Sequence, residues 1–184
     1  MNRIYLDSAA TSRMDSAVIE AMSASMAEIY GNPSSSHQYG RAAKSKIERA
    51  RRNIAKLLNV TPSEIVFTAG GSEADNMILR NAVCHLGVKR IISSKIEHHA
   101  VLHTLDVLEE DEELQVDYVN LNEGGSVDMN HFEQLVSDTT HKTLVSLMYV
   151  NNEIGTVLDA KKVSDLCKQN DTLFHSDAVQ VIGH

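Results

Sequence analysis

Polar residues follow four short apolar runs of the sequence, and their types suit the binding of a charged ligand. The pairs of run and cluster are Ile65–Thr68 with Gly70–Glu73, Arg90–Ser93 with Glu97-His98, Thr143–Tyr149 with Asn151-Asn152, and Leu173–His175 with Asp177. A carboxylate beside an apolar strand is costly unless a cation meets it. Where strands are parallel, their carboxyl ends line one ligand crevice. The pattern therefore predicts a single site assembled from the four segments.

The segment Ala69–Glu73 has the composition of an anion-binding turn. Its two glycines, Gly70 and Gly71, let the backbone approach a ligand closely, and free N–H groups at a helix start favour an anion. The segment matches neither a Walker loop nor G-x-G-x-x-G, so an ordinary strand–helix turn capped by Ser72 is an equal alternative. Asp177 has a comparable alternative as a helix N-cap.

Three histidines form the most obvious metal-ligand pattern. His99 and His103 are four residues apart on a predicted helix, and Asp106 falls on the same side. Without a clear third ligand this spacing is typical of surface histidines, and no metal site is predicted. His98 differs because it follows a strand, where its flat ring could stack on a ligand.

Sulfur-containing residues are interpreted as apolar side chains. Cys84 and Cys167 lie inside predicted helices, where a cysteine usually behaves as a small hydrophobe rather than a nucleophile. Met22, Met26 and Met77 are predicted to fill the core.

The apolar periodicity predicts the elements that must position these residues. Helices are predicted at Ser16–Tyr30, Gln38–Leu58, Glu73–Leu86, His99–Glu109, Asn130–Val136 and Ala160–Gln169, and strands at Ile65–Thr68, Arg90–Ser93, Gln115–Val119, Thr143–Tyr149 and Leu173–His175. The β-α-β-α alternation predicts an α/β fold with a mainly parallel sheet flanked by helices.

Bulk properties indicate a globular protein without a nucleic-acid or membrane role. Of the 184 residues, 42% are hydrophobic and 23% charged, and the net charge of −8 argues against nucleic-acid binding. No apolar run approaches the roughly 20 residues of a membrane helix. Two cysteines and a strand-like start without a signal peptide favour the cytoplasm. We expect an N-terminal arm, residues 1–15, and one incomplete large domain, residues 16–184, because no helix or polar tail closes the chain.

Six motifs together resemble one enzyme family. They are Ala9–Thr11, Gly31–Ser35, Phe67-Thr68 with Gly71–Asn76, Ser94–Val101, Asn151–Gly155 and His175–Gln180. In this order they resemble the N-terminal half of a cysteine desulfurase of the NifS/IscS type. Such enzymes belong to the class V aminotransferase group of fold-type I pyridoxal-phosphate enzymes, so the resemblance implies the large, cofactor-binding domain of that fold.

The resemblance implies specific roles toward pyridoxal 5′-phosphate. Gly71 and Ser72 would hold the phosphate, and His98 would stack on the ring, with a possible acid–base role. Asp177 would pair with the protonated ring nitrogen and strengthen the electron sink. A hydrogen bond from Gln180 would reach the phenolic oxygen, while Asn152 would contact the cofactor or the substrate carboxylate. Ala9–Thr11 and Asn32–Ser35 would border the substrate pocket.

Two family residues have no counterpart here. The Schiff-base lysine of the family follows the position of Asp177, whereas the last lysine of this chain is Lys168. The persulfide-forming cysteine lies further along still, so neither Cys84 nor Cys167 inherits its role. The chain alone is therefore expected to be inactive. Ser8, Ser12 and Ser72 are smaller departures, at positions where relatives often carry asparagine, threonine and threonine.

The implied activity is transfer of sulfur from L-cysteine, which gives alanine and an enzyme persulfide for iron–sulfur cluster or thio-cofactor synthesis. The resemblance further implies a homodimer and a sulfur-acceptor or scaffold protein as partner. Alternatives are a selenocysteine lyase, another class V aminotransferase, or a non-catalytic cofactor-binding or interaction fragment. A metal-binding protein that uses His99 and His103 is a more distant alternative.

Overall fold

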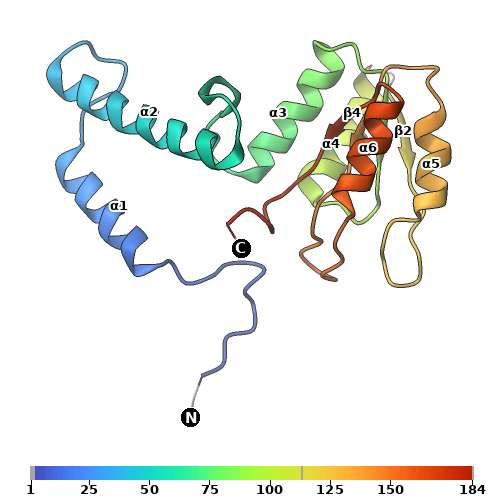
Figure 1. The fold of residues 1–184 in the computed structure, drawn as a ribbon, viewed down its shortest axis with the longest axis horizontal. Coiled ribbons are helices and arrows are strands. Elements are labelled where there is room, and N and C mark those ends of the chain that lie inside the picture. Colours follow the sequence, from blue (N-terminus) through green and yellow to red (C-terminus); the bar gives the residue numbers. More distant parts are fainter. Residues whose placement is uncertain (1–2, 113, 184) are drawn as a thin grey trace. The chain divides into compact units, whose positions relative to one another are not determined.

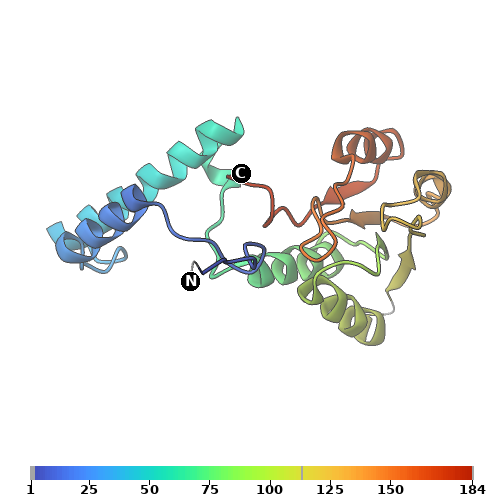
Figure 2. The same ribbon diagram turned by 90° about the horizontal axis from the view of Figure 1, so that it is seen from below.

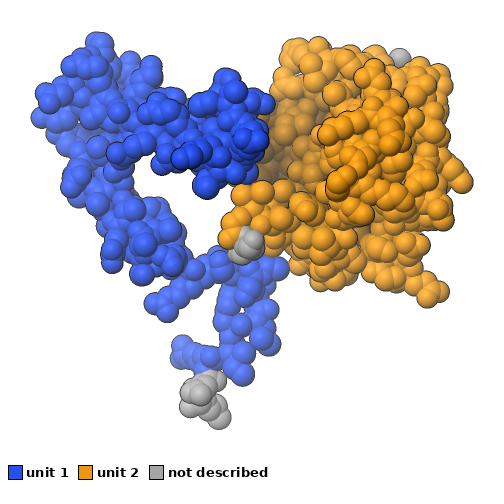
Figure 3. Space-filling model, in the orientation of Figure 1, with its two compact units in different colours: residues 1–67 blue, residues 68–184 orange. Residues whose placement is uncertain are grey.

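The chain divides into two compact units, Met1–Phe67 and Thr68–His184 (Figure 3). The structure is a computed structural model, and it describes residues 3–112 and 114–183. Each unit is described by itself. The expected division between an arm and a large domain at residue 15 stays a prediction.

The second unit, Thr68–His184, contains the whole parallel sheet. Its elements are α3 (Gly71–Cys84), β1 (Arg90–Ser93), α4 (His99–Glu112), β2 (Gln115–Tyr118), α5 (Met129–Ser137), β3 (Thr143–Ser146), α6 (Ala160–Gln169) and β4 (Leu173–His175) (Figure 1). The strand order is β2-β1-β3-β4, and every pairing is parallel. The predicted α/β fold with a parallel sheet is confirmed.

Helices cover both faces of this sheet, with α3 and α4 on one side and α5 and α6 on the other (Figure 2). The alternation of side chains along each strand explains the two layers. Ile91 and Leu144 belong to the apolar cluster of α3 and α4, whereas their neighbours Ile92 and Val145 belong to that of α5 and α6. All four residues of β1 and of β3 are buried, and the apolar pairs Ile91-Ile92 and Leu144-Val145 at their centres serve the two faces.

The first unit is helical and buries few side chains. It contains α1 (Ser16–Glu28), α2 (Gln38–Leu58) and a short 3₁₀ helix, η1 (Pro62–Glu64). The Asp15 carboxylate accepts the Ala17 N–H at 2.8 Å and so begins α1. At Gly40 a Cβ atom would lie 2.3 Å from the Ser35 carbonyl oxygen, so the close approach of this loop to α2 requires glycine.

The predicted strand Ile65–Thr68 is wrong. A strand needs a hydrogen-bonded neighbour, and no ladder within residues 3–112 and 114–183 includes this segment. Instead, the Arg51 guanidinium donates to the Ile65 carbonyl and lies 4.7 Å from the centre of the Phe67 ring. Three of the four expected strand ends therefore remain, and the fourth polar cluster follows an irregular segment.

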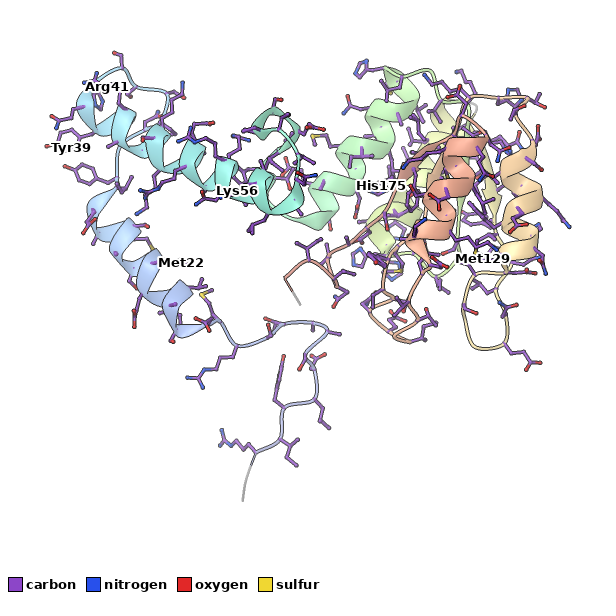
Figure 4. The ribbon with its side chains drawn as sticks, viewed as in Figure 1. Met22, Tyr39, Arg41, Lys56, Met129 and His175 are labelled. Carbon is purple, nitrogen blue, oxygen red and sulfur yellow. The ribbon has the colours of Figure 1, made fainter. Side chains whose placement is uncertain are left out.

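The methionines predicted to fill the core are exposed. Met22 (labelled in Figure 4) and Met26 are 47% and 70% exposed on α1, and Met77 is 36% exposed on α3. Helix α1 buries none of its residues. Its apolar spacing was read correctly as helical, but periodicity alone does not provide a packing partner.

No helix in the part of the chain that the structure describes is both long enough and apolar enough to cross a lipid bilayer.

Replacing Arg90 should destabilise the second unit strongly. Arg90 is 3% exposed; its guanidinium contacts the Asp117 carboxylate and donates to the carbonyl oxygens of Leu135 and Asp138 at 2.9 and 3.1 Å. Because Arg90→Met leaves these acceptors without a cation, it should lower the free energy of unfolding by about 3 kcal/mol. Chemical denaturation of the protein as encoded measures the loss.

Lys161→Met is the matched control, since Lys161 pairs with Asp165 at the surface, where ion pairs contribute little. Equal stability of the Arg90 and Lys161 variants would contradict this account of Arg90.

Candidate functional site

Backbone pairing continues beyond the last residues of β3 and β4 and positions Asp177. The Leu147 N–H donates to the His175 carbonyl at 3.2 Å, and the Tyr149 N–H donates to the Asp177 carbonyl at 2.9 Å. The Asp177 Oδ1 atom accepts the Val179 N–H at 2.9 Å and so caps the turn that follows. Asp177 therefore caps a turn rather than the helix of the alternative interpretation, because the described residues contain no helix after β4, and the half-buried residue stays at the strand end.

The predicted strand Thr143–Tyr149 is shorter in the structure, where β3 ends at Ser146. The residues that follow lead into a hairpin-like return. The Tyr149 carbonyl accepts the Leu158 N–H at 2.8 Å, and Val150 bridges Val157 in an antiparallel sense. This return holds the turn that contains Asn151 and Asn152 at the carboxyl end of β3.

Asn151 ties this turn to the loop after β1. Its side chain is buried; Oδ1 accepts the Glu153 and Ile154 N–H groups at 2.8 and 2.9 Å, while Nδ2 donates to the Ile96 carbonyl at 2.7 Å. Asn151 is therefore a turn residue that also joins two loops. The half-buried Asn152 beside it lines a surface hollow.

His98 lies between two surface hollows. Its Nδ1 atom accepts the Ala100 N–H at 3.1 Å, which makes it the cap of α4, and its ring is exposed. One hollow includes His98 together with Asn152, and the other includes His98 together with Ser72. The ring is thus placed between two segments that the sequence analysis assigned to the same site.

The start of α3 has the geometry of an anion site. The residue before the helix, Gly70, has extended backbone angles and no side chain caps the helix, so the interpretation of Ser72 as a cap is wrong. Glu73 instead folds back to accept the Ala69 N–H at 2.5 Å. Gly71 lies against the segment after β4, because a Cβ atom there would be 2.8 Å from Val179 Cγ2. The first amides of α3 therefore keep their donors for a ligand.

The structure connects the predicted site residues through the Gly71–Val179 contact and through two hollows that share His98, neither of which has Asp177 among its lining residues. Gly71 adjoins the segment after Asp177, Ser72 shares a hollow with His98, and His98 shares another with Asn152. Gln180 is half-buried in the turn that Asp177 caps. Their roles toward a cofactor stay predictions, as does the placement of Ala9–Thr11 and Asn32–Ser35, which belong to the first unit.

Glu97 is a buried acid whose importance the sequence reading missed. It is 6% exposed, its Oε1 accepts the Ser94 hydroxyl at 2.6 Å, and within the described residues Oε2 has no hydrogen-bond partner. Burial raises the pKa of Glu97 to about 7, opposed by the hydrogen bonds from Ser94 and the Met148 backbone. The negative charge of Asp177 raises this pKa further, and His175 lowers it. Glu97 and Asp177 therefore share one electrostatic environment.

Asp75 and His175 form a second buried contact that was not anticipated. The His175 Nε2 atom lies 3.5 Å from Asp75 Oδ1, and both side chains are less than one tenth exposed. A signal was available in the sequence, because Asp75 precedes the buried Leu79 and Ala82 by four and seven residues and so falls on the core face of α3.

The remaining candidates do not form a site. The His99 and His103 rings lie 5.3 Å apart, but the described residues contain no group of three or more possible metal ligands. Cys84 is exposed, whereas Cys167 is buried and its pKa is raised to about 11 by burial. The Cys167 thiol is therefore protonated near neutral pH, when its nucleophilicity is low.

The second unit thus has a parallel sheet between two helical layers, with polar residues at its carboxyl edge. The model of the family described as aminotransferase class-V matches residues 4–184, and the chain belongs to this family.

Individual relatives are cysteine desulfurases. The chain is 43% identical over 185 residues to a putative cysteine desulfurase IscS 1 of Bacillus subtilis, covering 100% of this chain and 48% of the relative. A cysteine desulfurase IscS of Clostridium botulinum is 42% identical, with coverage of 100% and 46%. The chain thus spans about half the length of the curated relatives it matches, as expected for the N-terminal half of such an enzyme.

Solved structures of similar fold also include a cysteine desulfurase. A NifS-like protein superposes with a TM-score of 0.90 at 40% identity, over 99% of this chain and 50% of that protein. An apo cysteine desulfurase of Thermococcus onnurineus NA1 gives a TM-score of 0.88 at 26% identity, over 98% of this chain and 45% of that protein. The resemblance seen in the sequence motifs is confirmed.

Replacing Glu97 by glutamine should remove a pH-dependent loss of stability. The pKa of Glu97 is raised from 4.5 to about 7, so the folded protein holds this proton more tightly than the unfolded chain. The resulting stabilisation is complete below pH 4.5 and is lost as the pH rises through 7. At about 1.4 kcal/mol per pH unit, the loss reaches about 3 kcal/mol.

Denaturation at about pH 5 and about pH 8 checks this window. Glu97→Gln should resemble the wild type at the lower pH and be more stable at the higher one. Glu153 is an exposed acid that lines the same hollow as Glu97, together with Asn152. Glu153→Gln should therefore have the pH dependence of stability of the wild type. Identical pH profiles for wild type and Glu97→Gln would contradict the account.

Adding a methyl group at Gly71 should weaken anion binding at α3. The new Cβ would meet Val179 Cγ2 at 2.8 Å, so the helix start or the β4 segment must shift. Calorimetric titration with inorganic phosphate should show an affinity loss on the order of tenfold for Gly71→Ala. Gly71→Ala combined with Val179→Ala should recover the affinity.

Gly70→Ala is the matched control, because a Cβ atom there meets nothing within 4 Å. Equal phosphate affinity for the Gly70 and Gly71 variants would refute the contact's role.

Proposed function

We propose that the protein acts as a pyridoxal-phosphate-dependent cysteine desulfurase, of which this chain contributes part of the cofactor-binding domain. The observation that carries the proposal is the contact of an uncapped helix start with the segment after Asp177, through Gly71 and Val179. This brings an anion-binding group and a carboxylate into one neighbourhood. A ligand with a phosphate and a cationic ring fits that pair.

The residues present fit pyridoxal 5′-phosphate. The amides of Gly71 and Ser72 would bind the phosphate, and the absence of a side-chain cap on α3 supports this assignment. The His98 ring, exposed between its two hollows, would stack on the pyridine ring. Gln180 and Asn152 would hydrogen-bond the oxygens of the cofactor or of the substrate.

Asp177 would determine the electronic state of the cofactor. When bound, pyridoxal phosphate supplies an electron sink that stabilises negative charge next to the substrate amine. A carboxylate opposite the ring nitrogen keeps that nitrogen protonated. The Asp177 backbone is fixed to Tyr149 and its Oδ1 to Val179, so the carboxylate is held in place before the ligand arrives.

The substrate and partners follow from the relatives. We propose L-cysteine as substrate, with alanine and an enzyme persulfide as products; one solved relative, 33% identical, is described as SspA in complex with cysteine. No residue of this chain is assigned as the Schiff-base lysine or the nucleophilic cysteine. Release to a sulfur-acceptor or scaffold protein for iron–sulfur cluster assembly, a homodimeric state and a cytoplasmic location complete the proposal.

Asp177→Asn should reduce desulfurase turnover while leaving the fold intact. The amide keeps the shape and an oxygen for the Val179 N–H, but it removes the negative charge. Loss of one well-placed electrostatic partner lowers rates roughly a hundredfold or more. The assay uses the complete enzyme of which this chain is proposed to form part. It measures alanine formation from L-cysteine and from L-selenocysteine, together with cofactor occupancy by absorbance.

Asp165→Asn, on the exposed face of α6, is the control and should retain full turnover. Near-normal turnover of Asp177→Asn at full cofactor occupancy would reject the role of Asp177. A strong preference for L-selenocysteine in the wild type would assign a selenocysteine lyase instead.

A further inference from the structure

Asp75 and His175 connect two elements that carry opposite ends of the proposed cofactor site. His175 (labelled in Figure 4) is the last residue of β4; its Nδ1 atom lies 3.0 Å from the Ser146 hydroxyl and its Nε2 atom 3.5 Å from Asp75 Oδ1. The Asp75 and His175 side chains are 6% and 8% exposed. Burying a carboxylate this deeply is costly unless a partner compensates it. Among the described residues, His175 is the ionisable partner of Asp75 within ion-pair distance.

Asp75 and His175 each lie a few residues from one of the two proposed cofactor anchors. Asp75 lies one helical turn after Gly71, at the end of α3 proposed to hold a phosphate. His175 lies two residues before Asp177, the proposed partner of a ring nitrogen. The contact between Asp75 and His175 therefore spans the same two elements that the cofactor would span.

The main packing partners of these two elements lie elsewhere in the unit. Helix α3 packs against α4, and β4 pairs with β3 and packs against α6. The Gly71–Val179 contact joins them at the surface, and the Asp75–His175 contact joins them in the interior. Both lie within a few residues of the two proposed anchors.

We propose that Asp75 and His175 are positioning residues that set the distance between the phosphate-binding start of α3 and the Asp177 carboxylate. This inference rests on the proposed function, because it concerns the span of the same cofactor. A rigid ligand gains from both anchors only when their separation matches its own length. Neither residue needs to touch the ligand to have this effect.

The charged environment of His175 is acidic. The acidic groups around it are Asp75 from α3 and Glu97 from the loop after β1, and Asp177 follows it on its own segment and acts on Glu97. Ser146 from β3 contributes a neutral hydroxyl. The imidazole thus contacts the Asp75 carboxyl and acts on that of Glu97, and its removal leaves both without this partner.

Three ligands distinguish an effect on the distance between the two anchors from an effect on either anchor alone. Inorganic phosphate reports on the start of α3 alone, pyridoxine reports on the ring end alone, and pyridoxine 5′-phosphate engages both without an aldehyde that would react with lysines. The affinity ratio of pyridoxine 5′-phosphate to pyridoxine measures how well the two anchors act together. Calorimetry on the protein as encoded gives all three affinities.

The variants are Asp75→Asn, which keeps the shape and removes the charge, and His175→Leu, which removes both ring nitrogens. Each should reduce the affinity ratio about tenfold while changing the affinity of either single-end probe by no more than about twofold. The affinity ratio of the double variant should be no lower than that of the single variant with the lower ratio, because the two residues act as one unit. His175→Gln, which retains an N–H donor, should recover part of the ratio.

Asp117→Asn is the matched control, since it removes the half-buried carboxylate of another ion pair of this unit, with the buried Arg90, and should leave the ratio unchanged. An unchanged ratio in Asp75→Asn and His175→Leu, or parallel loss for all three probes, would overturn the positioning role. Wild-type protein that binds pyridoxine 5′-phosphate no more tightly than pyridoxine would instead overturn the proposed function, and this inference with it.

Discussion

The parallel register of β1, β3 and β4 is the constraint on which the rest of the structure depends. The three strands run in one direction, so the chain leaves each of them at the same edge of the sheet. Backbone hydrogen bonds at Leu147 and Tyr149 carry the β3–β4 pairing as far as Asp177. Because β1 and β3 pack against helices on both faces, a slip of one residue would exchange the side chains that the two helical layers receive. The positions of the polar residues that follow are fixed as a consequence.

Side chains between the loops then convert this shared edge into a defined site. The Asn151 amide holds the loop after β1 to the turn after β3, and Gly71 allows the start of α3 to approach the segment after β4. Buried acids accompany this arrangement: the pKa of Glu97 is raised, and Asp75 lies 3.5 Å from His175. Such groups reduce stability when they lack partners, so their presence beside the proposed cofactor residues is consistent with selection for binding rather than for stability.

Sequence periodicity predicted the sheet and the helices well, and it failed where structure depends on distant partners. Gln38–Leu58, Arg90–Ser93 and Ala160–Gln169 have the predicted bounds because local patterns determine them. Ile65–Thr68 has the composition of a strand but no neighbouring strand in the described chain, and Met22 lies on a helix whose apolar side is uncovered. The strand-end pattern located Asp177, Asn152 and His98, whereas their roles came from family resemblance. Asp75 and His175 were missed because two residues so far apart in sequence become a pair only in the folded chain.

A crystal structure of the protein as encoded, grown with pyridoxal 5′-phosphate, tests the central claim most directly. The account predicts phosphate oxygens at the N–H groups of Gly71 and Ser72, the ring against His98, and the ring nitrogen opposite the Asp177 carboxylate. A phosphate bound away from the start of α3, or a ring nitrogen facing away from Asp177, would contradict it.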